Sequence, residues 1–374
     1  GYNWTDSNFN SGRKLAAKID GIIKGYKETG RLCKYVILVT HSMGGLVARS
    51  ACVLHGAQSQ VLGVIHGVQP AVGAPAAYWR MKAGFERAGI KSTVAAWVLG
   101  TDGEEVTCIL GNAPGGLELL PTKDYTANDG SKQWLHVTLK SGRKISLPNG
   151  DPYAEIYRIG GPSSKTPKKL DASFWRLVNP EWLDPMDSGA KIILKKTKKS
   201  WERYSYCLEL AETSHKQLGT KFHEPTYQFY SSGLGTVDKI MFMHEDFFYR
   251  KKRALGVEIT EPSRKVSCRG ECTMYADICN QEIARPLPQP QKTFLACMSR
   301  ISDYREGGDG TVPDSSGGAL KGKGIKKVFI LKKYDHQDVY KKRGARDFVI
   351  TAVRNSALKR IEEGIKEGGV GAAK

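Results

Sequence analysis

The sequence predicts an α/β protein in which helices flank a mainly parallel sheet. Residues 35–39, 61–68 and 328–331 are unbroken apolar runs that are too short for helices, which is typical of strands buried on both faces. Helical patterns lie between these runs, and strands that alternate with helices usually pair in parallel. We therefore expect one core sheet with strands from both ends of the chain.

The helices of this core have recognisable limits. The first is predicted over residues 11–29, where apolar side chains recur at helical spacing, Ser11 can cap the start and Gly30 ends the helix. Residues 46–54 follow the first strand as a second helix, and residues 343–367 form the last one with an apolar face. These helices would cover the two faces of the sheet.

The pattern loosens after about residue 75, which predicts an insertion. We expect residues 1–75 to form the first part of the core, residues 76–295 an inserted cap or lid region, and residues 296–374 the last part. In residues 133–147, apolar and polar side chains alternate on either side of a Ser-Gly pair, which is typical of a hairpin. We predict loops over residues 161–169 and 284–292, and a helical, aromatic segment over residues 201–218.

Composition narrows the class of protein. The chain has 374 residues, of which 40% are hydrophobic, and this excludes wholesale disorder. No stretch of eighteen apolar residues occurs, which excludes an ordinary transmembrane helix. Lys and Arg number 57 against 38 Asp and Glu, a net charge of +19. Such a chain is attracted to phosphate-bearing partners, either nucleic acid or anionic lipid.

The eight cysteines are used in two ways. Cys33 and Cys52 flank an apolar strand and helix, and we predict inert core thiols there. A second group lies late in the chain, with a spacing that matches zinc sites poorly. A disulfide, a metal site and free thiols all stay open for its members, Cys268, Cys272, Cys279 and Cys297.

The strongest chemical signal is residues 40–44, Thr-His-Ser-Met-Gly, where a buried strand turns into a helix. This context is that of a nucleophile elbow, in which a serine is held on a tight turn above the sheet. Gly44 would let helix and strand approach closely, whereas Thr40 stands where the usual motif has Gly. Ser42 is the predicted nucleophile, and a helix-capping serine is the alternative.

A serine needs a base and an orienting acid, which follow the nucleophile in this fold in the order acid, then histidine. Asp309 lies in the glycine-rich run 306–313, and His336 follows the strand at 328–331. We predict that Ser42, His336 and Asp309 form a triad. The acids that compete for the orienting role are Asp303, Asp314, Asp335 and Asp338.

An oxyanion hole needs two backbone N–H donors. Met43, directly after the nucleophile, should supply one. The segment Gly1 to Trp4 resembles the end of a strand whose beginning is absent, so the N–H of Tyr2 is predicted as the second donor, with Asn3 as second choice. No secretory signal is visible at this end. His41 is expected to pack beneath the elbow.

Residues 40–45 and 308–313, Thr-His-Ser-Met-Gly-Gly and Gly-Asp-Gly-Thr-Val-Pro, resemble the α/β-hydrolase lipases related to lecithin–cholesterol acyltransferase and the PGAP-like deacylases. Residues 115–122 resemble another block of these lipases. In that family the Asp of the second motif is the triad acid, which by resemblance is Asp309. The resemblance implies an α/β-hydrolase fold with no metal and no cofactor.

Further blocks are more similar to the antibacterial lipase effectors of type VI secretion systems: residues 1–4, 151–157 and 222–227. This resemblance implies hydrolysis of membrane phospholipids in the periplasm of a target cell. It also implies delivery without a signal peptide, through a type VI spike or delivery component, and neutralisation by a cognate immunity protein in the producer.

Basic and aromatic clusters have uses that fit a phospholipase. Residues 195–199, 250–253 and 341–343 are basic and could hold the enzyme at an anionic membrane, or be a solvated face. Residues 201–206 and 241–249 are aromatic and could form a lid or acyl-chain pocket, or be core.

The sequence thus favours a serine lipase or phospholipase that hydrolyses acyl esters of glycerophospholipids through an acyl-enzyme. Acyl transfer to another acceptor would use the same triad, so a lipid acyltransferase or a general lipase is the nearest alternative. A non-catalytic, basic nucleic-acid-binding protein is the alternative from another class, and its motivation is the charge of +19. The residues do not reveal the acyl position that is cut or the preferred head group.

Overall fold

The computed structural model describes most of the chain and divides it into two compact units. Described are residues 1–85, 100, 103–139, 141–159, 175–184, 193–244, 266–267, 272–278 and 299–371. Unit 1 is formed by residues 1–72, 213–235 and 307–374, and unit 2 by residues 73–212 and 236–306. Each unit is described by itself.

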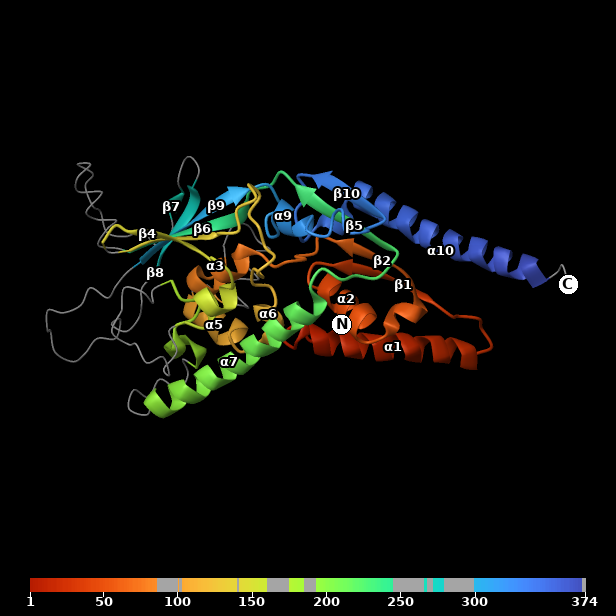
Figure 1. Ribbon diagram of the computed structural model, residues 1–374, viewed down its shortest axis with the longest axis horizontal. Helices are drawn as coiled ribbons and strands as arrows, with labels where there is room; N and C mark the ends of the chain where they lie inside the picture. Colours follow the sequence, from red (N-terminus) through yellow and green to blue (C-terminus); the bar gives the residue numbers. More distant parts are fainter. Residues whose placement is uncertain are drawn as a thin grey trace. The chain divides into compact units, whose positions relative to one another are not determined.

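Unit 1 contains a four-stranded, fully parallel sheet (Figure 1). Its strands lie in the order β1 (Val36–His41), β2 (Val61–Gly67), β5 (Thr226–Ser232) and β10 (Lys327–Lys332). Three of these are the predicted apolar runs, and β5 was not predicted. The parallel pairing and the flanking helices confirm the predicted α/β class.

Three helices of unit 1 lie where the sequence predicted helices. The first differs at its start, because it is capped four residues before the predicted cap: the Ser7 hydroxyl accepts from the Phe9 N–H at 3.0 Å, and Ser11 lies inside the helix. The elements are α1 (Asn8–Glu28), α2 (Gly44–Leu54), η1 (Ala57–Gln60), α9 (Asp314–Gly317), η6 (Val339–Lys341) and α10 (Arg343–Gly371).

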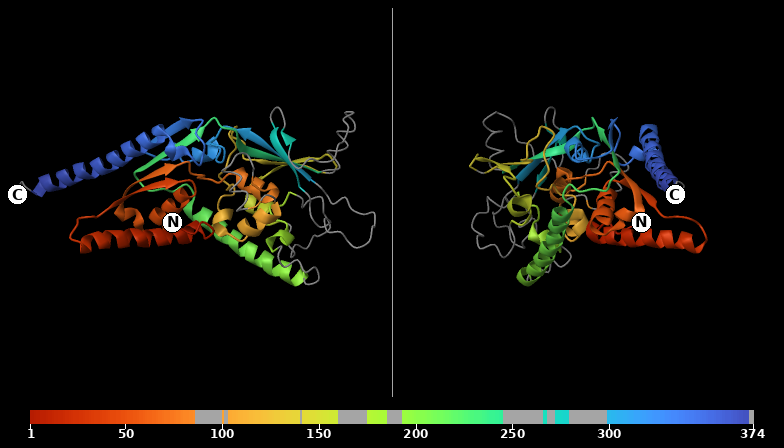
Figure 2. Two further views of the ribbon diagram at one scale, coloured as in Figure 1. Left: turned by 180° about the vertical axis from the view of Figure 1, so that it is seen from behind. Right: turned by 45° about the vertical axis from the view of Figure 1, so that its right-hand side comes forward.

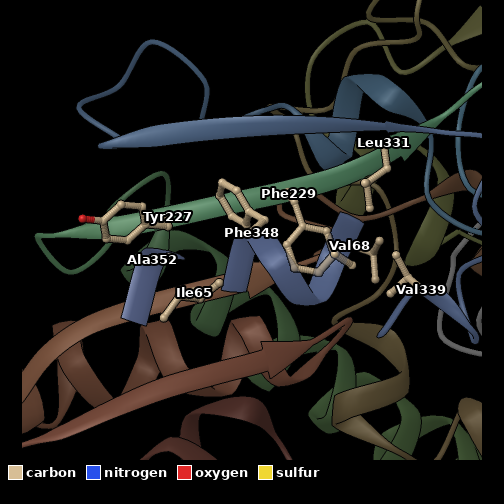
Figure 3. Close-up of a cluster of buried hydrophobic side chains, with 9 residues drawn as sticks. Ile65, Val68, Tyr227, Phe229, Leu331, Val339, Phe348 and Ala352 are labelled. Atoms are coloured by element: carbon tan, nitrogen blue, oxygen red, sulfur yellow. The ribbon is translucent and has the colours of Figure 1, made fainter. Parts of the chain in front are cut away.

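Helices cover the two faces of this sheet from opposite sides (Figure 1, Figure 2). Neighbouring residues of β2 alternate between them: Val64 packs with α1 and α2, and Ile65 packs on the other face with α10. Figure 3 shows the second cluster, in which Phe229 of β5 lies against Phe348 of α10 with ring centroids 5.8 Å apart. Burying both faces fixes the register of each strand, because a shift of one residue would exchange the two sets of side chains.

Unit 2 contains a six-stranded sheet in the order β4-β3-β6-β9-β8-β7. Its pairings are antiparallel except for β3 with β6. The predicted hairpin at 133–147 is confirmed as the first two of the strands β3 (Leu135–Thr138), β4 (Lys144–Leu147), β6 (Thr236–His244), β7 (Val266–Ser267), β8 (Cys272–Ile278) and β9 (Ser299–Glu306).

Helical segments make up much of the rest of unit 2. Trp201 and Tyr204 on the longest of them are buried, whereas Tyr206 is exposed, so the first two are part of the core. The segments are α3 (Pro75–Ala83), α5 (Gly103–Leu110), α6 (Pro114–Leu117), the π-helical turn η2 (Tyr153–Tyr157), η4 (Pro180–Leu183) and α7 (Ile193–Leu218), whose last residues belong to unit 1.

The division of the chain differs from the predicted one at two places. Residues 213–235, which carry β5, return to unit 1, whereas the predicted insertion ran unbroken over 76–295. Strand β9 belongs to unit 2, whereas the predicted last core part began at residue 296. The predicted loops at 161–169 and 284–292 lie outside the described residues, as do most of 241–249 and 250–253.

Among the described residues, no helix is both long and apolar enough to cross a membrane. Cys52 is buried with a free thiol, and Cys33 is half-buried and also free, which agrees with inert thiols. The late cysteine cluster lies outside the residues whose side chains are described.

Candidate active site

Ser42 occupies a strained turn between β1 and α2. Its φ is 52°, in the left-handed region that residues other than glycine rarely adopt. The turn is fixed because the Ser42 N–H donates to the Gly67 carbonyl at 2.9 Å, at the end of the neighbouring strand β2. Strain of this kind is found where the surrounding structure holds a functional side chain in one orientation.

The glycine that lets the elbow pack closely is Gly45, and the prediction for Gly44 was wrong. A Cβ added at Gly44 would meet only the Thr40 Cβ at 3.9 Å, which is ordinary contact. A Cβ added at Gly45 would lie 2.7 Å from the Cγ of Gln69, a buried residue just after β2. The close approach is therefore between the first turn of α2 and the segment that follows β2.

Thr40, which stands where the motif usually has glycine, has its own partner. Its hydroxyl lies 2.9 Å from Nδ1 of His66 and 3.4 Å from the Ile65 carbonyl. His66 is fully buried, and this burial, together with the charge of Arg49, lowers the pKa of His66 to about 3. The imidazole is thus neutral near pH 7, and it fills the space beside Thr40 without adding a charge beneath the elbow.

The structure brings Ser42, His336 and Asp309 together in one chain of hydrogen bonds. Nε2 of His336 lies 2.8 Å from the Ser42 hydroxyl, and Nδ1 lies 2.7 Å from Oδ2 of Asp309. His336 and Asp309 are 2% and 1% exposed, so water does not compete for the bond between them. With Nδ1–H donating to the carboxylate, Nε2 is the nitrogen that can accept the serine proton.

The loop around Asp309 holds its carboxylate in place. Oδ1 accepts from the N–H groups of Thr311 at 2.9 Å and Val312 at 2.7 Å, which leaves Oδ2 for the imidazole. The backbone joins the two residues as well, because the His336 N–H donates to the Asp309 carbonyl at 2.9 Å. Three hydrogen bonds, in addition to the one between the carboxylate and the imidazole, therefore hold these two groups in place.

The competing acids that can be described have other partners. The Ser232 hydroxyl donates to Asp314 at 2.5 Å, and burial raises the pKa of Asp314. Asp335 accepts from the Gln337 N–H at 2.9 Å, and Asp338 pairs with Lys341 at 3.0 Å. The side chain of Asp303 is outside the described part.

Two residues tie the loop of His336 to the elbow. Nε2–H of His41 donates to the His336 carbonyl at 2.8 Å, and burial lowers the pKa of His41. The Tyr340 hydroxyl donates to the Thr40 carbonyl at 2.6 Å. The sequence predicted that His41 packs beneath the elbow. No signal in the sequence pointed to Tyr340 or to His66, because their contacts link residues far apart in the chain.

The geometry bears only in part on the two predicted oxyanion donors, the N–H groups of Met43 and Tyr2. Met43 is buried where α2 begins, and the first N–H groups of a helix have no partner within it. Tyr2 is 44% exposed. The Asn3 side chain accepts from the Thr5 N–H and hydroxyl, so it caps its own turn. The roles of Met43 and Tyr2 stay predictions.

The remaining histidines that are described lie in other settings. His55 contacts the Phe9 carbonyl at 2.9 Å, and His136 contacts the Ser146 hydroxyl at 2.9 Å. No cluster of three or more His, Cys, Asp or Glu side chains that could hold a metal occurs within the described ranges.

Comparisons with known proteins bear on the fold that holds these residues. Residues 11–87, which include the elbow and the strands β1 and β2, match the family model of the PGAP1-like alpha/beta domain. The chain has an α/β-hydrolase fold. A chain of the crystal structure of the Tle4–Tli4 complex is 26% identical, with a TM-score of 0.64, over 96% of this chain and 68% of that one. These matches confirm the family resemblance that the sequence motifs predicted for this hydrolase.

A second solved structure is less similar. The crystal structure of Bacillus licheniformis lipase BlEst2 in mature form is 25% identical over 34% of this chain and 52% of that one, with a TM-score of 0.20, and supports no inference. No curated protein sequence matches the hydrolase.

Proposed function

We propose that this α/β hydrolase is a serine lipase or phospholipase with Ser42 as nucleophile, His336 as base and Asp309 as orienting acid. The observation that carries the proposal is the unbroken chain of hydrogen bonds from the Ser42 hydroxyl through His336 to Asp309, at a serine with a φ of 52°. A serine hydroxyl becomes a useful nucleophile only when such a base accepts its proton.

The proposed reaction has two halves, acylation and deacylation of Ser42, and each group acts once in each half. Ser42 attacks the ester carbonyl while His336 takes its proton, and Asp309 stabilises the imidazolium that forms. The backbone N–H groups of Met43 and Tyr2 would bind the oxyanion. His336 then returns the proton to the departing alcohol, which leaves an acyl-enzyme. Water, activated by the same imidazole, attacks this ester and releases the fatty acid.

The proposed substrate is membrane glycerophospholipid, and the proposed setting is antibacterial type VI secretion. The sequence blocks shared with type VI lipase effectors support this, as does the likeness to a chain from the Tle4–Tli4 complex. By the same resemblance we propose a cognate immunity protein and a type VI spike or delivery component as partners. The site of action would be the periplasm of the target cell, at the membrane.

Two measurements with one variant test the proposal. Wild type should react with a fluorophosphonate probe at Ser42 and release fatty acid from phospholipid vesicles, as detected by mass spectrometry. Ser42→Ala should lose both, with hydrolysis falling by at least about 10⁴-fold. Ser59→Ala, at an exposed serine of η1, is the matched control and should keep both. Equal fatty-acid release by wild type and Ser42→Ala would refute the proposal.

The alternatives give different results in the same assays. An acyltransferase would label at Ser42 but transfer the acyl group to an added alcohol in preference to water. A basic nucleic-acid binder would not label at Ser42 and would bind DNA with a steep dependence on salt.

A further inference from the structure

Basic side chains are frequent along the last strand of unit 1 and in the segments on either side of it. Residues 321–346, here called the basic strip, contain ten Lys or Arg and two Asp, a net charge of +8 out of the +19 of the entire chain. All ten basic side chains are exposed. A short stretch of the sequence thus supplies a large share of the positive charge and presents it to solvent.

Few of these charges are neutralised within the protein. Among the described residues, only two of the ten form ion pairs, Lys341 with Asp338 at 3.0 Å and Arg343 with Asp347 at 3.4 Å. Of the other eight, Lys332 also attracts the Asp314 carboxylate, and the rest leave their attraction available for an external anion. Exposed charges of one sign also attract such a partner from a distance of several ångströms.

Apolar side chains are exposed within the same strip. Phe329 and Ile330, in the middle of β10, are 36% and 37% exposed, and Lys327 and Lys332 stand at the two ends of the strand. The two apolar side chains face opposite sides of the sheet, and the Phe329 ring stacks on Phe348 of α10 with centroids 5.4 Å apart, so Ile330 is the one available to an outside partner. In the described sheet β10 is one of the two edge strands and pairs with β5 alone. Lysines by themselves can protect an edge strand from aggregation, but exposed Phe and Ile on that strand work against such protection.

The strip is continuous with the proposed catalytic base. Lys332 ends β10, Lys333 follows it, and His336 comes three residues later with Nε2 2.8 Å from the Ser42 hydroxyl. A surface held against the basic strip is therefore held close to the residues that would act on an ester.

We propose that the basic strip is the surface through which unit 1 docks onto an anionic lipid bilayer. Lysines would contact lipid phosphates while Ile330 enters the boundary between head groups and acyl chains, where apolar side chains beside basic ones bind best. Duplex nucleic acid would match the charge but would leave Ile330 in water. The inference rests on the proposed function for its biological setting, but the docking itself does not require catalysis.

The test separates docking from catalysis by using Ser42→Ala protein throughout. Its binding is measured by co-sedimentation with phosphatidylcholine vesicles, with and without phosphatidylglycerol. The strip variant carries Lys326→Gln, Lys327→Gln, Lys332→Gln and Lys342→Gln. The control variant removes the same charge from α1 of the same unit with Lys14→Gln, Lys18→Gln, Lys24→Gln and Lys27→Gln, all exposed.

We expect binding only to vesicles that contain phosphatidylglycerol. Each engaged lysine contributes about fivefold to partition, so the strip variant should lose about 25-fold even if only two of its four lysines reach the lipid. The control variant should lose less than fivefold. Ile330→Ser should weaken the binding that persists at high salt, because that part depends on apolar contact.

Other outcomes overturn the proposal. They are an equal loss in the strip and control variants, no loss in the strip variant, or binding of DNA in preference to anionic vesicles. Fluorophosphonate labelling of the strip variant with Ser42 restored shows that its site is folded. If the wild type itself fails to label, the proposed function fails while the vesicle result still stands.

Discussion

Replacing Asp309 by Asn should separate the orienting role of this carboxylate from its role in holding the loop. The Asn Oδ1 atom can still accept from the N–H groups of Thr311 and Val312, which donate to Asp309 at 2.9 and 2.7 Å. The Nδ2 amide would then face Nδ1 of His336, which lies 2.7 Å from the carboxylate in the wild type. An amide is a donor at this position, so it requires Nδ1 to be an acceptor.

The magnitude follows from the tautomer that this forces on His336. With the proton moved to Nε2, the nitrogen that faces the Ser42 hydroxyl at 2.8 Å can no longer take its proton. In serine hydrolases with this arrangement, the same substitution lowers kcat by about 10⁴-fold, which is about 5.5 kcal/mol in the activation free energy. The fold should be nearly unaffected, since the two loop hydrogen bonds persist.

The assay is kcat for a soluble short-chain ester, together with the midpoint of thermal unfolding. Asp314→Asn is the matched control, because Asp314 is a partly buried acid of the same segment whose partner is the Ser232 hydroxyl. It should retain kcat within about threefold. If Asp309→Asn keeps more than a tenth of the wild-type kcat while Asp314→Asn loses most of it, the assignment of the acid is wrong.

Three further predictions concern the surroundings of the elbow. His41→Phe removes the donor to the His336 carbonyl and should lower kcat about tenfold with KM unchanged, whereas His41→Gln should recover part of the loss in the ester assay. Gly45→Ala should lower the free energy of unfolding in urea by about 1–3 kcal/mol, because its Cβ would meet Gln69 at 2.7 Å, and Gly44→Ala should change it far less. Burial lowers the pKa of His66 from 6.5 to about 3, so the unfolded state binds the extra proton between these values. The free energy of unfolding should therefore fall as pH drops from 6.5 towards 3, by up to about 1.4 kcal/mol per pH unit, and His66→Gln should reduce this slope in urea titrations at several pH values.

The sequence predicted most of unit 1 because its strands are apolar on both faces. The exception is β5, in which the buried residues include Thr226, Gln228 and Ser231. Several of their polar atoms have partners inside the protein: the Gln228 side-chain amide donates to the Gly317 carbonyl, and the Ser231 hydroxyl accepts from the Tyr334 N–H. Hydropathy cannot reveal a strand whose polar side chains find partners far away in the chain, so β5 was missed.

The candidate site was predictable for a different reason. In the α/β-hydrolase fold the order of nucleophile, acid and base is fixed, and this order, together with the strand before each residue or its loop position, selected the three residues. What surrounds them was not predictable, because it depends on contacts such as that of Tyr340 with Thr40, which are 300 residues apart. The error at Gly44 has the same origin, since the residue that packs against the helix, Gln69, is known only from the fold.

The spacing of Ser42 and His336 has a consequence for the time at which activity arises. The two residues, in contact in the folded protein, are separated by 294 positions in the chain. At a translation rate of about 5–20 residues per second, roughly 15–60 s pass between the synthesis of one and of the other. During that interval the nascent polypeptide carries an alcohol with no imidazole to activate it. A ribosome that stalls or a chain that is truncated early would thus release a product that lacks the proposed catalytic base.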